Sequence, residues 1–313
     1  MRPVVYLVRA LPGGVPERLA ERLELRGGER RPRPRPVLLE QARGAEVLAV
    51  TYLDKVDEEL LAGLPSVRRV CSYGVGVNHL DLPACRRRGV LVSNTPDVVT
   101  NATADLAMAL LLAAARRVAE GDRLIRSGGW GEATPDFFLG TEVTGKVLGV
   151  VGFGRIGQAV ARRAAGFEMR VLYTSPREVP IAGARRVGLE ELLSESDFVS
   201  LHCPLTPETR DLLSRERIQR MKKGAVLVNT SRGPVVDEMA LAEALERGHL
   251  FAAGLDVFRD EPDVPDRLRK LEKAVLTPHV GSGTVETRTA MARMVWDEVE
   301  RAAAGLPPIH AVP

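Results

Sequence analysis

The chain has 313 residues, of which 45% are hydrophobic and 27% charged, and its formal net charge is +3. This length allows two domains with separate cores, and the composition is that of a soluble globular protein. So small a net charge, with basic residues scattered along helical stretches, argues against nucleic acid as a partner. The cysteines, Cys71, Cys85 and Cys203, are an odd number without metal-ligand spacing. We therefore expect no metal site, and reduced thiols in a cytoplasm.

The apolar stretches argue against a secretory or membrane protein. Residues 1–8 lack the long apolar core and the cleavage site of a signal peptide, and they suit a first strand instead. Residues 106–115 are flanked by polar residues and are too few to span a bilayer. We expect a cytoplasmic protein with no membrane partner.

The first part of the chain alternates strand-like and helix-like segments. Strands are predicted at Val4–Val8, Glu46–Val50, Val67–Cys71 and Val90–Ser93, and helices at Val15–Leu23, Glu58–Leu61 and Leu80–Arg88. Alternating prolines at residues 30–36 predict an extended, polyproline-like surface connector. One long helix is predicted from Thr100 to Arg126.

A second alternating block follows this long helix. Its predicted strands are Val147–Val151, Arg170–Tyr173, Phe198–Leu201, Ala225–Asn229, Ala252–Leu255 and Val275–Thr277. Its predicted helices lie near Ile156–Ala165, Leu189–Leu193, Arg215–Met221 and Met239–Arg247. A final helix near Val285–Ala304 is followed by Gly305 and then Pro307, a common C-terminal signal.

This alternation predicts an α/β fold with two doubly wound parallel-sheet domains. Residues 98–284 form the predicted Rossmann-type dinucleotide-binding domain, with a six-stranded sheet. Residues 1–97, completed by residues 285–313, form a smaller flavodoxin-like substrate-binding domain. Two chain crossings between the domains would make a hinge with a cleft between them.

A glycine-rich turn follows the strand Val147–Val151. Residues 152–157 read GFGRIG and open an alanine-rich helix. In this context Gly152 permits a tight turn, Gly154 lets the backbone approach a pyrophosphate, and Gly157 lets helix and strand pack closely. The helix N-terminus then faces the phosphates. The turn therefore predicts a dinucleotide cofactor.

The next strand of this block bears on the choice of cofactor. It is followed by Thr174-Ser175-Pro176-Arg177, without the acidic residue that usually binds the adenosine ribose 2′-hydroxyl. The Ser175 hydroxyl and the Arg177 charge suit a 2′-phosphate. We therefore expect NADP or NAD as cofactor, with NADP(H) slightly favoured.

Of the five histidines, His279 is placed for chemistry. Pro278 and Gly281 define a turn at a predicted strand end, where doubly wound folds bind their ligands. Imidazole also titrates in the range that suits proton transfer to a keto oxygen. We interpret the other four as structural or solvated: His79 and His202 as structural, His249 and His310 as solvated.

Two further residues complete a set suited to reduction of a 2-keto acid. A carboxylate at Glu261 beside the imidazole would favour the imidazolium and orient the ring, although this charged loop equally allows a surface acid. The planar guanidinium of Arg232 can bind a substrate carboxylate and polarise the keto oxygen, with a salt bridge as the alternative. We predict Arg232, Glu261 and His279 as catalytic residues.

Several blocks, in this order, resemble the D-isomer-specific 2-hydroxyacid dehydrogenase family. The main ones are NTSRGPVVD at residues 229–237, GLDV at 254–257 with EP at 261–262, and TPHVGS at 277–282. Further blocks are YGVGVN at 73–78, NTP at 94–96 and CPLTPET at 203–209. The resemblance covers nearly the whole chain.

The resemblance implies roles for individual residues. It implies that Arg232 binds the carboxylate and keto groups, that His279 donates the proton and that Glu261 pairs with His279. It further implies that the backbone at Val75-Gly76 holds the substrate carboxylate and that Asp256 lies near the nicotinamide. Leu53 is added to the substrate-binding residues. The complete set of predicted cofactor-binding residues is Thr103, Gly152, Gly154, Arg155, Ile156, Gly157, Ser175, Arg177, Cys203, Pro204, Thr209, Thr230, Ser231, Asp256 and Gly281.

Within the family, residues 75–81 and 128–130 resemble most the glyoxylate/hydroxypyruvate reductase branch. This implies hydride transfer from NAD(P)H to a small 2-keto acid, giving the D-2-hydroxy acid. Alternatives are a family member acting on phosphoglycerate, a bulkier 2-keto acid or phosphite, and a non-catalytic, nucleotide-sensing regulator similar to the family's corepressors. We expect a homodimer, for which the apolar helix 104–115 is either an interface or core.

Overall fold

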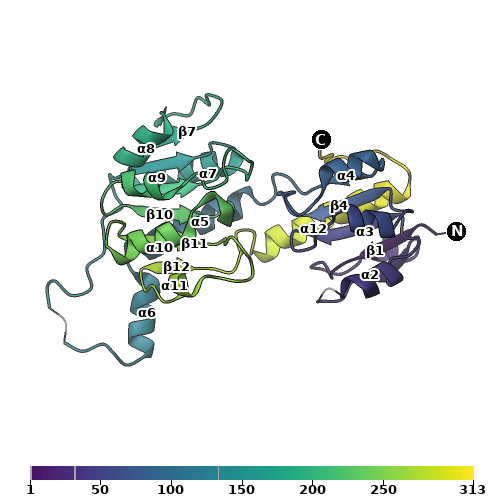
Figure 1. The fold of residues 1–313 in the computed structure, drawn as a ribbon, viewed down its shortest axis with the longest axis horizontal. Helices are drawn as coiled ribbons and strands as arrows, with labels where there is room; N and C mark the ends of the chain where they lie inside the picture. Colours follow the sequence, from purple (N-terminus) through teal and green to yellow (C-terminus); the bar gives the residue numbers. More distant parts are fainter. Residues whose placement is uncertain (1, 32, 133) are drawn as a thin grey trace. The chain divides into compact units, whose positions relative to one another are not determined.

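The computed structural model describes residues 2–31, 33–132 and 134–313, which divide into two compact units. The first unit comprises the residues up to Val99 together with Ser282–Pro313, and the second is Thr100–Gly281. The chain thus passes between the units at 99/100 and 281/282, where 97/98 and 284/285 are predicted. Figure 1 shows the yellow C-terminal helix among the purple and blue elements of the first unit.

The first unit is built on one parallel sheet. Its described strands, in the spatial order β2-β1-β3-β4-β5, are β1 (Val4–Leu7), β2 (Glu24–Gly27), β3 (Val47–Thr51), β4 (Arg69–Tyr73) and β5 (Leu91–Ser93). Its described helices are α1 (Glu17–Ala20), α2 (Arg35–Gln41), α3 (Glu58–Gly63), α4 (Leu82–Arg87) and α12 (Val285–Ala303). The last helix packs against β3 and β4, so the end of the chain contributes to the core of this unit.

Three features of this unit differ from the prediction. The predicted helix at 15–23 is only the four residues of α1, and β2 follows it as an edge strand. β2 carries Glu and Arg and is not fully buried on either face, so it lacks the apolar alternation that marks a strand. The predicted proline connector, residues 30–36, overlaps the beginning of α2. Pro34 is the N-cap of this helix, and another proline lies in its first turn. Proline suits that position because its missing N–H would have no helical partner. Pro32 of the connector lies outside the described residues.

The second unit is built on a longer parallel sheet. In the described residues its strands, in the spatial order β12-β11-β10-β9-β6-β7-β8, are β6 (Val147–Val151), β7 (Arg170–Thr174), β8 (Ala184–Arg186), β9 (Phe198–Leu201), β10 (Val226–Asn229), β11 (Ala252–Leu255) and β12 (Ala274–Leu276). Its α-helices there are α5 (Thr100–Ala115), α6 (Val118–Arg126), α7 (Arg155–Ala164), α8 (Leu189–Glu195), α9 (Arg215–Arg220), α10 (Glu238–Glu246) and α11 (Asp266–Arg269). Short 3₁₀ turns occupy Ala165–Phe167 and Gly233–Val235.

The described part of this sheet has seven strands where six are predicted. The additional strand, β8, pairs with β7 at the edge of the sheet and has two exposed arginines. Three residues with so little apolar character do not show a strand pattern in the sequence.

Both faces of the second sheet are covered by helices. Val147 and Val151 of β6 belong to one apolar cluster, whereas Leu148 and Val150 belong to another. Because successive side chains of a strand point to opposite faces, these clusters lie on the two sides of the sheet. Burial on both faces explains why the strands of this unit read as continuous apolar runs.

The predicted helix 100–126 is two helices in the structure. Arg117 adopts a left-handed conformation with φ 55°, which ends α5 and begins α6. Its guanidinium binds Glu120 and lies over the Phe138 ring, 3.9 Å from the ring centroid. α5 packs against α7, β10 and β11, so the stretch 104–115 is core of its own unit.

Candidate active site

The strand order places several loops at one edge of the second sheet. Because the strands are parallel, the loops after β6, β9, β10, β11 and β12 all leave from their carboxyl ends. The chain builds β6, β7 and β8 in one direction and then continues with β9 on the other side of β6. Ligands of doubly wound sheets bind at such a reversal point.

The loop after β6 has the geometry of a phosphate-binding turn. Gly152 has φ +90°, and a Cβ there would lie 2.5 Å from the backbone nitrogen of Cys203. A Cβ on Gly157 would lie 2.3 Å from the Gly152 carbonyl oxygen, so this residue too must be glycine. A Cβ on Gly154, the N-cap of α7, would meet nothing within 4 Å. The turn is therefore closely packed beneath and open above Gly154, as a pyrophosphate site requires.

Two buried polar atoms at the same edge fit a bound dinucleotide. Thr230 Oγ1, just after β10, and His202 Nδ1, just after β9, have no hydrogen-bond partner among the described residues. Buried polar atoms in proteins are normally hydrogen-bonded. Burial lowers the pKa of His202 to about 3, so its ring is neutral, with Nε2 2.8 Å from Ser200 Oγ. The glycine turn and these atoms suit NAD(P), which would supply the hydride when bound.

Other predicted cofactor residues fall into two groups. Arg155 and Ile156 begin α7, and a Cβ on Gly281 would lie 3.4 Å from Thr103 of α5, so these residues border the same edge. Two hydroxyl groups have internal partners instead. Thr209 Oγ1 donates to the Pro204 carbonyl at 2.6 Å, and Ser231 Oγ donates to Asn229 Oδ1 at 2.8 Å. These two hydroxyls hold their own loops.

The turn after β7 carries the predicted determinants of cofactor choice. Pro176 and Arg177 are exposed and Ser175 is half-buried. Arg186 of β8 donates from Nε to the Ser175 carbonyl and from Nη2 to the Pro176 carbonyl, each at 3.1 Å. An arginine that no sequence motif marks therefore holds this turn.

A buried aspartate organises the turn that carries His279. Asp256 follows β11 and is 1% exposed. Its carboxylate accepts hydrogen bonds from Thr277 Oγ1 at 2.6 Å, Val280 N at 2.8 Å and Gly281 N at 2.7 Å. Burial raises the pKa of Asp256, although these donors and the His279 charge oppose the rise. The family resemblance implies a place near the nicotinamide for Asp256; in the structure its carboxylate anchors the 277–281 turn.

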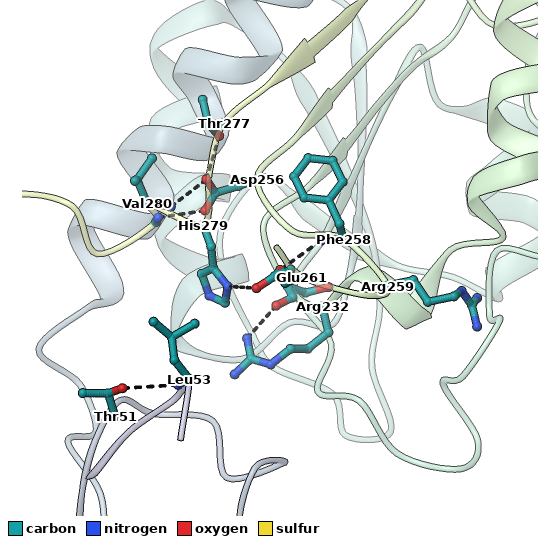
Figure 2. Close-up of polar contacts among 12 residues, drawn as sticks. Thr51, Leu53, Arg232, Asp256, Phe258, Arg259, Glu261, Thr277, His279 and Val280 are labelled. Atoms are coloured by element: carbon teal, nitrogen blue, oxygen red, sulfur yellow. Dashed lines mark hydrogen bonds and ion pairs between the residues drawn. The ribbon is translucent and has the colours of Figure 1, made fainter. Parts of the chain in front are cut away.

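His279 and Glu261 form a hydrogen-bonded pair. His279 lies in this turn with φ 51°, and its backbone N–H donates to the Asp256 carbonyl at 2.8 Å. Its Nδ1 lies 2.7 Å from Glu261 Oε2, while Glu261 Oε1 accepts from Phe258 N at 3.0 Å (Figure 2). Burial opposes ionisation of Glu261, but the hydrogen bond and charge of His279, the Phe258 N–H and the Arg232 charge lower its pKa overall. The ionised carboxylate thus orients the imidazole.

Arg232 lies on the loop after β10, and Figure 2 shows it beside Glu261 and His279. Its Nη1 donates to the Ser231 carbonyl at 2.6 Å, and its own carbonyl accepts from Asn229 Nδ2 at 3.0 Å. A Cβ on the next residue, Gly233, would lie 1.9 Å from the Phe258 carbonyl carbon. Only glycine allows the Arg232 loop and the Glu261 loop to approach so closely.

The remaining histidines lie away from this cluster in the sequence and have other contacts. His79 Nε2 is 3.1 Å from Ser72 Oγ. His249 is half-buried with Nε2 3.1 Å from the Ile218 carbonyl, so the expectation that it is solvated is wrong. The backbone N–H of His310 donates to Glu298 at 2.8 Å.

The predicted substrate residues Leu53, Val75 and Gly76 belong to the first unit. Leu53 follows β3 and is 54% exposed, and Val75 follows β4 and is 39% exposed. The Val75 carbonyl accepts from Asn94 Nδ2 at 2.8 Å. These residues lie at the carboxyl ends of two adjacent strands of their sheet.

Two kinds of feature are absent from the described residues. Within residues 2–31, 33–132 and 134–313, no three His, Cys, Asp or Glu side chains are grouped so as to hold a metal ion. Over the same residues, no helix has the length and hydropathy needed to cross a membrane.

Comparison with known proteins supports the sequence resemblance. Residues 108–281 match the model of the D-isomer specific 2-hydroxyacid dehydrogenase, NAD binding domain. A glyoxylate reductase of Pyrococcus furiosus is 47% identical over 304 residues, covering 94% of this chain and 90% of the relative.

Solved structures agree with this result. The crystal structure of a protein from Thermus thermophilus is 47% identical, with a TM-score of 0.94 over 99% of this chain and 100% of that one. An NADPH-dependent glyoxylate/hydroxypyruvate reductase from Sinorhizobium meliloti, in complex with NADP and malonate, is 31% identical, with a TM-score of 0.86 over 100% of this chain and 97% of that one. The predicted α/β architecture of two parallel sheets is confirmed. The chain belongs to the D-isomer-specific 2-hydroxyacid dehydrogenase family, and residues 108–281 match its NAD-binding domain.

Proposed function

We propose that this protein is an NAD(P)H-dependent reductase of glyoxylate and hydroxypyruvate. The observation that carries the proposal is the His279–Glu261 pair, 2.7 Å apart beside Arg232 at the ligand-binding edge of the NAD-binding domain. Relatives named glyoxylate reductase support the choice of a small 2-keto acid. The reaction would give glycolate or D-glycerate.

The side chains divide the work of such a reduction. Arg232 would bind the substrate carboxylate and polarise the keto oxygen, since its planar fork matches a carboxylate. His279 would donate a proton to that oxygen when hydride is transferred to the carbon. Glu261 would orient the ring and stabilise the imidazolium. Val75, Gly76 and Leu53 would contact the substrate, and Gly152–Gly157, Thr103, Thr230 and Gly281 would contact the cofactor.

We propose that NADP(H) is slightly favoured over NAD(H). Residues 174–177, directly at the end of β7, hold no carboxylate to bind two ribose hydroxyls, whereas Ser175 can donate to a 2′-phosphate and Arg177 is exposed beside it. Arg186, bound to the same turn, adds positive charge. The relative from Sinorhizobium meliloti is described as NADPH-dependent, in agreement with this proposal.

Turnover measured with a panel of 2-keto acids tests the proposed function. Glyoxylate and hydroxypyruvate, each with NADPH and NADH, should give higher kcat/KM than a branched 2-keto acid, 3-phosphohydroxypyruvate or, in the oxidative direction, phosphite. Preference for one of the other compounds would assign the enzyme another substrate. Binding of cofactor with no turnover of any compound would favour the nucleotide-sensing regulator.

We further propose a homodimer that forms through α6 and the segment after it. In Figure 1, α6 and the described residues after it extend away from the sheet of their unit. None of the residues of α6 is buried, and two of its apolar side chains are open to solvent. Val118 is 57% exposed and Ile125 is 55% exposed. Trp130, Phe137 and Leu139 are also exposed, and so many exposed apolar side chains indicate a protein interface. Ile125→Glu should shift the mass in light scattering toward a monomer, whereas Arg185→Glu should not.

A cytoplasmic location is part of the same proposal. Cys71, Cys85 and Cys203 are buried free thiols. Burial raises the pKa of Cys71 to about 12 and that of Cys203 to about 11, so both are unreactive thiols. A reducing compartment suits such a set.

A further inference from the structure

The loop at the end of β3, residues 51–54, is closed by a buried carboxylate. Asp54 is 7% exposed, and its Oδ2 accepts from both the backbone nitrogen and the hydroxyl of Thr51, each at 2.8 Å. The Asp54 backbone N–H donates back to the Thr51 carbonyl at 3.0 Å. The loop is thus a small ring of hydrogen bonds between its first and last residues.

A second strand end holds this ring in place. Arg9, just beyond β1, donates from Nε to Asp54 Oδ1 at 2.7 Å. β1 and β3 are adjacent strands, so the ion pair connects the carboxyl ends of neighbouring strands. The side chains of Arg9 and Asp54 are 19% and 7% exposed, so water screens the pair less than a surface ion pair.

This ring presents Leu53 outward. The Leu53 backbone nitrogen donates to Thr51 Oγ1 at 3.3 Å, which Figure 2 shows, while its side chain remains 54% exposed. An exposed leucine is unremarkable alone. Here, however, three hydrogen bonds and a part-buried ion pair fix the loop that carries it, although the leucine itself adds little to the core. Such an arrangement suits contact with a ligand, because a side chain on a preformed loop loses little conformational freedom on binding.

We propose that Asp54, held by Arg9, is a positioning residue that fixes Leu53 as a wall against the substituent of the 2-keto acid. This proposal rests on the proposed function, in which Leu53 contacts the substrate. A fixed apolar wall admits the hydrogen of glyoxylate or the hydroxymethyl group of hydroxypyruvate and excludes a branched substituent. A loop that can move would lose this selection.

The test compares a small and a branched substrate in Asp54 variants. For Asp54→Ala, the ratio of kcat/KM for hydroxypyruvate to that for 4-methyl-2-oxopentanoate should fall by about tenfold, the scale on which pocket shape discriminates apolar groups. KM for hydroxypyruvate should rise, while kcat and the Kd for NADPH should stay near those of the parent. Asp54→Asn keeps an acceptor for Thr51 and should give a smaller fall.

Glu58→Ala is the matched control. Glu58 accepts from Arg87 and Arg88 on the surface of the same unit, rather than from a residue of loop 51–54. It should leave the substrate ratio unchanged.

Arg9→Met should reproduce part of the Asp54→Ala effect, since the Thr51 bonds remain. A parental substrate ratio in Asp54→Ala, with or without a lower Tm, would show that the carboxylate serves stability alone and would overturn the proposal. If Asp54→Ala does not fold, a parental ratio in both Asp54→Asn and Arg9→Met overturns it.

Amide hydrogen exchange separates failure of this proposal from failure of the proposed function. If the parent enzyme reduces none of these acids, the proposed function fails on that result alone. In that case the Thr51 and Leu53 amides should still exchange faster in Asp54→Asn than in the parent, with Glu58→Ala unchanged. Equal exchange in all three proteins would mean that Asp54 does not fix the loop.

Discussion

Two turns at the carboxyl edge of the second sheet are held in opposite ways. The turn at 277–281 surrounds the carboxylate of Asp256, which is 1% exposed and accepts three hydrogen bonds. The turn at 174–177 lies beside the outermost strand, β8, whose arginines are exposed. From this strand Arg186 donates hydrogen bonds to the carbonyls of Ser175 and Pro176. A buried network gives His279 one orientation, whereas an exposed turn tolerates exchange of its side chains. Substitutions near the first turn should therefore change rate and stability, and those in the second only the choice of cofactor.

The largest effect is expected beside the buried turn, at Arg232. Arg232→Ala should lower kcat/KM for glyoxylate by two orders of magnitude or more, since a charge-assisted bidentate contact contributes about 3 kcal/mol in a transition state. NADPH affinity should hardly change, because Arg232 is assigned to the substrate. Arg215→Ala, which removes an exposed partner of Glu243, is the control. Near-normal activity of Arg232→Ala would remove this residue from the mechanism.

Asp256 tests the buried network directly. Asp256→Ala leaves the Thr277 hydroxyl and the Val280 and Gly281 N–H groups without their acceptor. Unsatisfied buried groups cost about 1–3 kcal/mol each, so the urea midpoint should fall clearly, and kcat with it. Asp256→Asn keeps one acceptor oxygen and should be intermediate. An unchanged midpoint for the alanine variant would mean that the turn does not depend on this carboxylate.

Glu261→Gln should have a smaller effect on rate and a characteristic effect on pH dependence. Loss of the carboxylate should lower kcat by about tenfold, less than the roughly hundredfold or more of a group that transfers the proton itself, because Glu261 acts through His279. The lowered pKa of Glu261 keeps its carboxylate ionised down to acid pH, so the parent should lose this contribution to the rate only on the acid side, and the variant should lack that fall. A pH–rate profile identical to that of the parent would leave Glu261 as a loop acid.

The same substitution has a signed effect on stability. The pKa of Glu261 is lowered in the folded protein, so its ionisation stabilises the fold above the usual glutamate range. This contribution is lost as pH falls through that range toward the lowered pKa. The Tm of the parent should therefore fall more than that of Glu261→Gln between about pH 5 and pH 3. Parallel Tm curves would contradict the lowered pKa.

The smallest effect is expected in the exposed turn. Ser175→Asp should shift the ratio of kcat/KM for NADPH to that for NADH by about tenfold toward NADH, because the carboxylate accepts from the ribose hydroxyls and repels a 2′-phosphate. The Tm and the kcat at saturating cofactor should stay near those of the parent. A parent enzyme that already prefers NADH strongly would show that this turn does not bind a 2′-phosphate.

Most of the second unit could be predicted because its strands are buried on both faces. Val147–Val151, Phe198–Leu201 and Ala252–Leu255 have the predicted bounds. The edge strands β2 and β8 were missed because each has one neighbour and exposed charged residues, so their pairing is not encoded in an apolar pattern. The break at Arg117 was missed because a non-glycine residue in the left-handed conformation has no signature in the sequence.

The amino-acid sequence by itself determined the parallel α/β class, the glycine turn and the candidate residues Arg232, Glu261 and His279. Each of these depends on a local pattern or on a short spacing within a single loop. Only the tertiary structure decided that Asp256 anchors the His279 turn, that Arg186 holds the turn at Ser175 and that Arg9 binds Asp54. Each of these contacts joins loops of different strands. The strand order decides which loops become neighbours, and burial decides which polar groups lose water and must find a protein partner. Neither can be predicted from the order of residues along the chain.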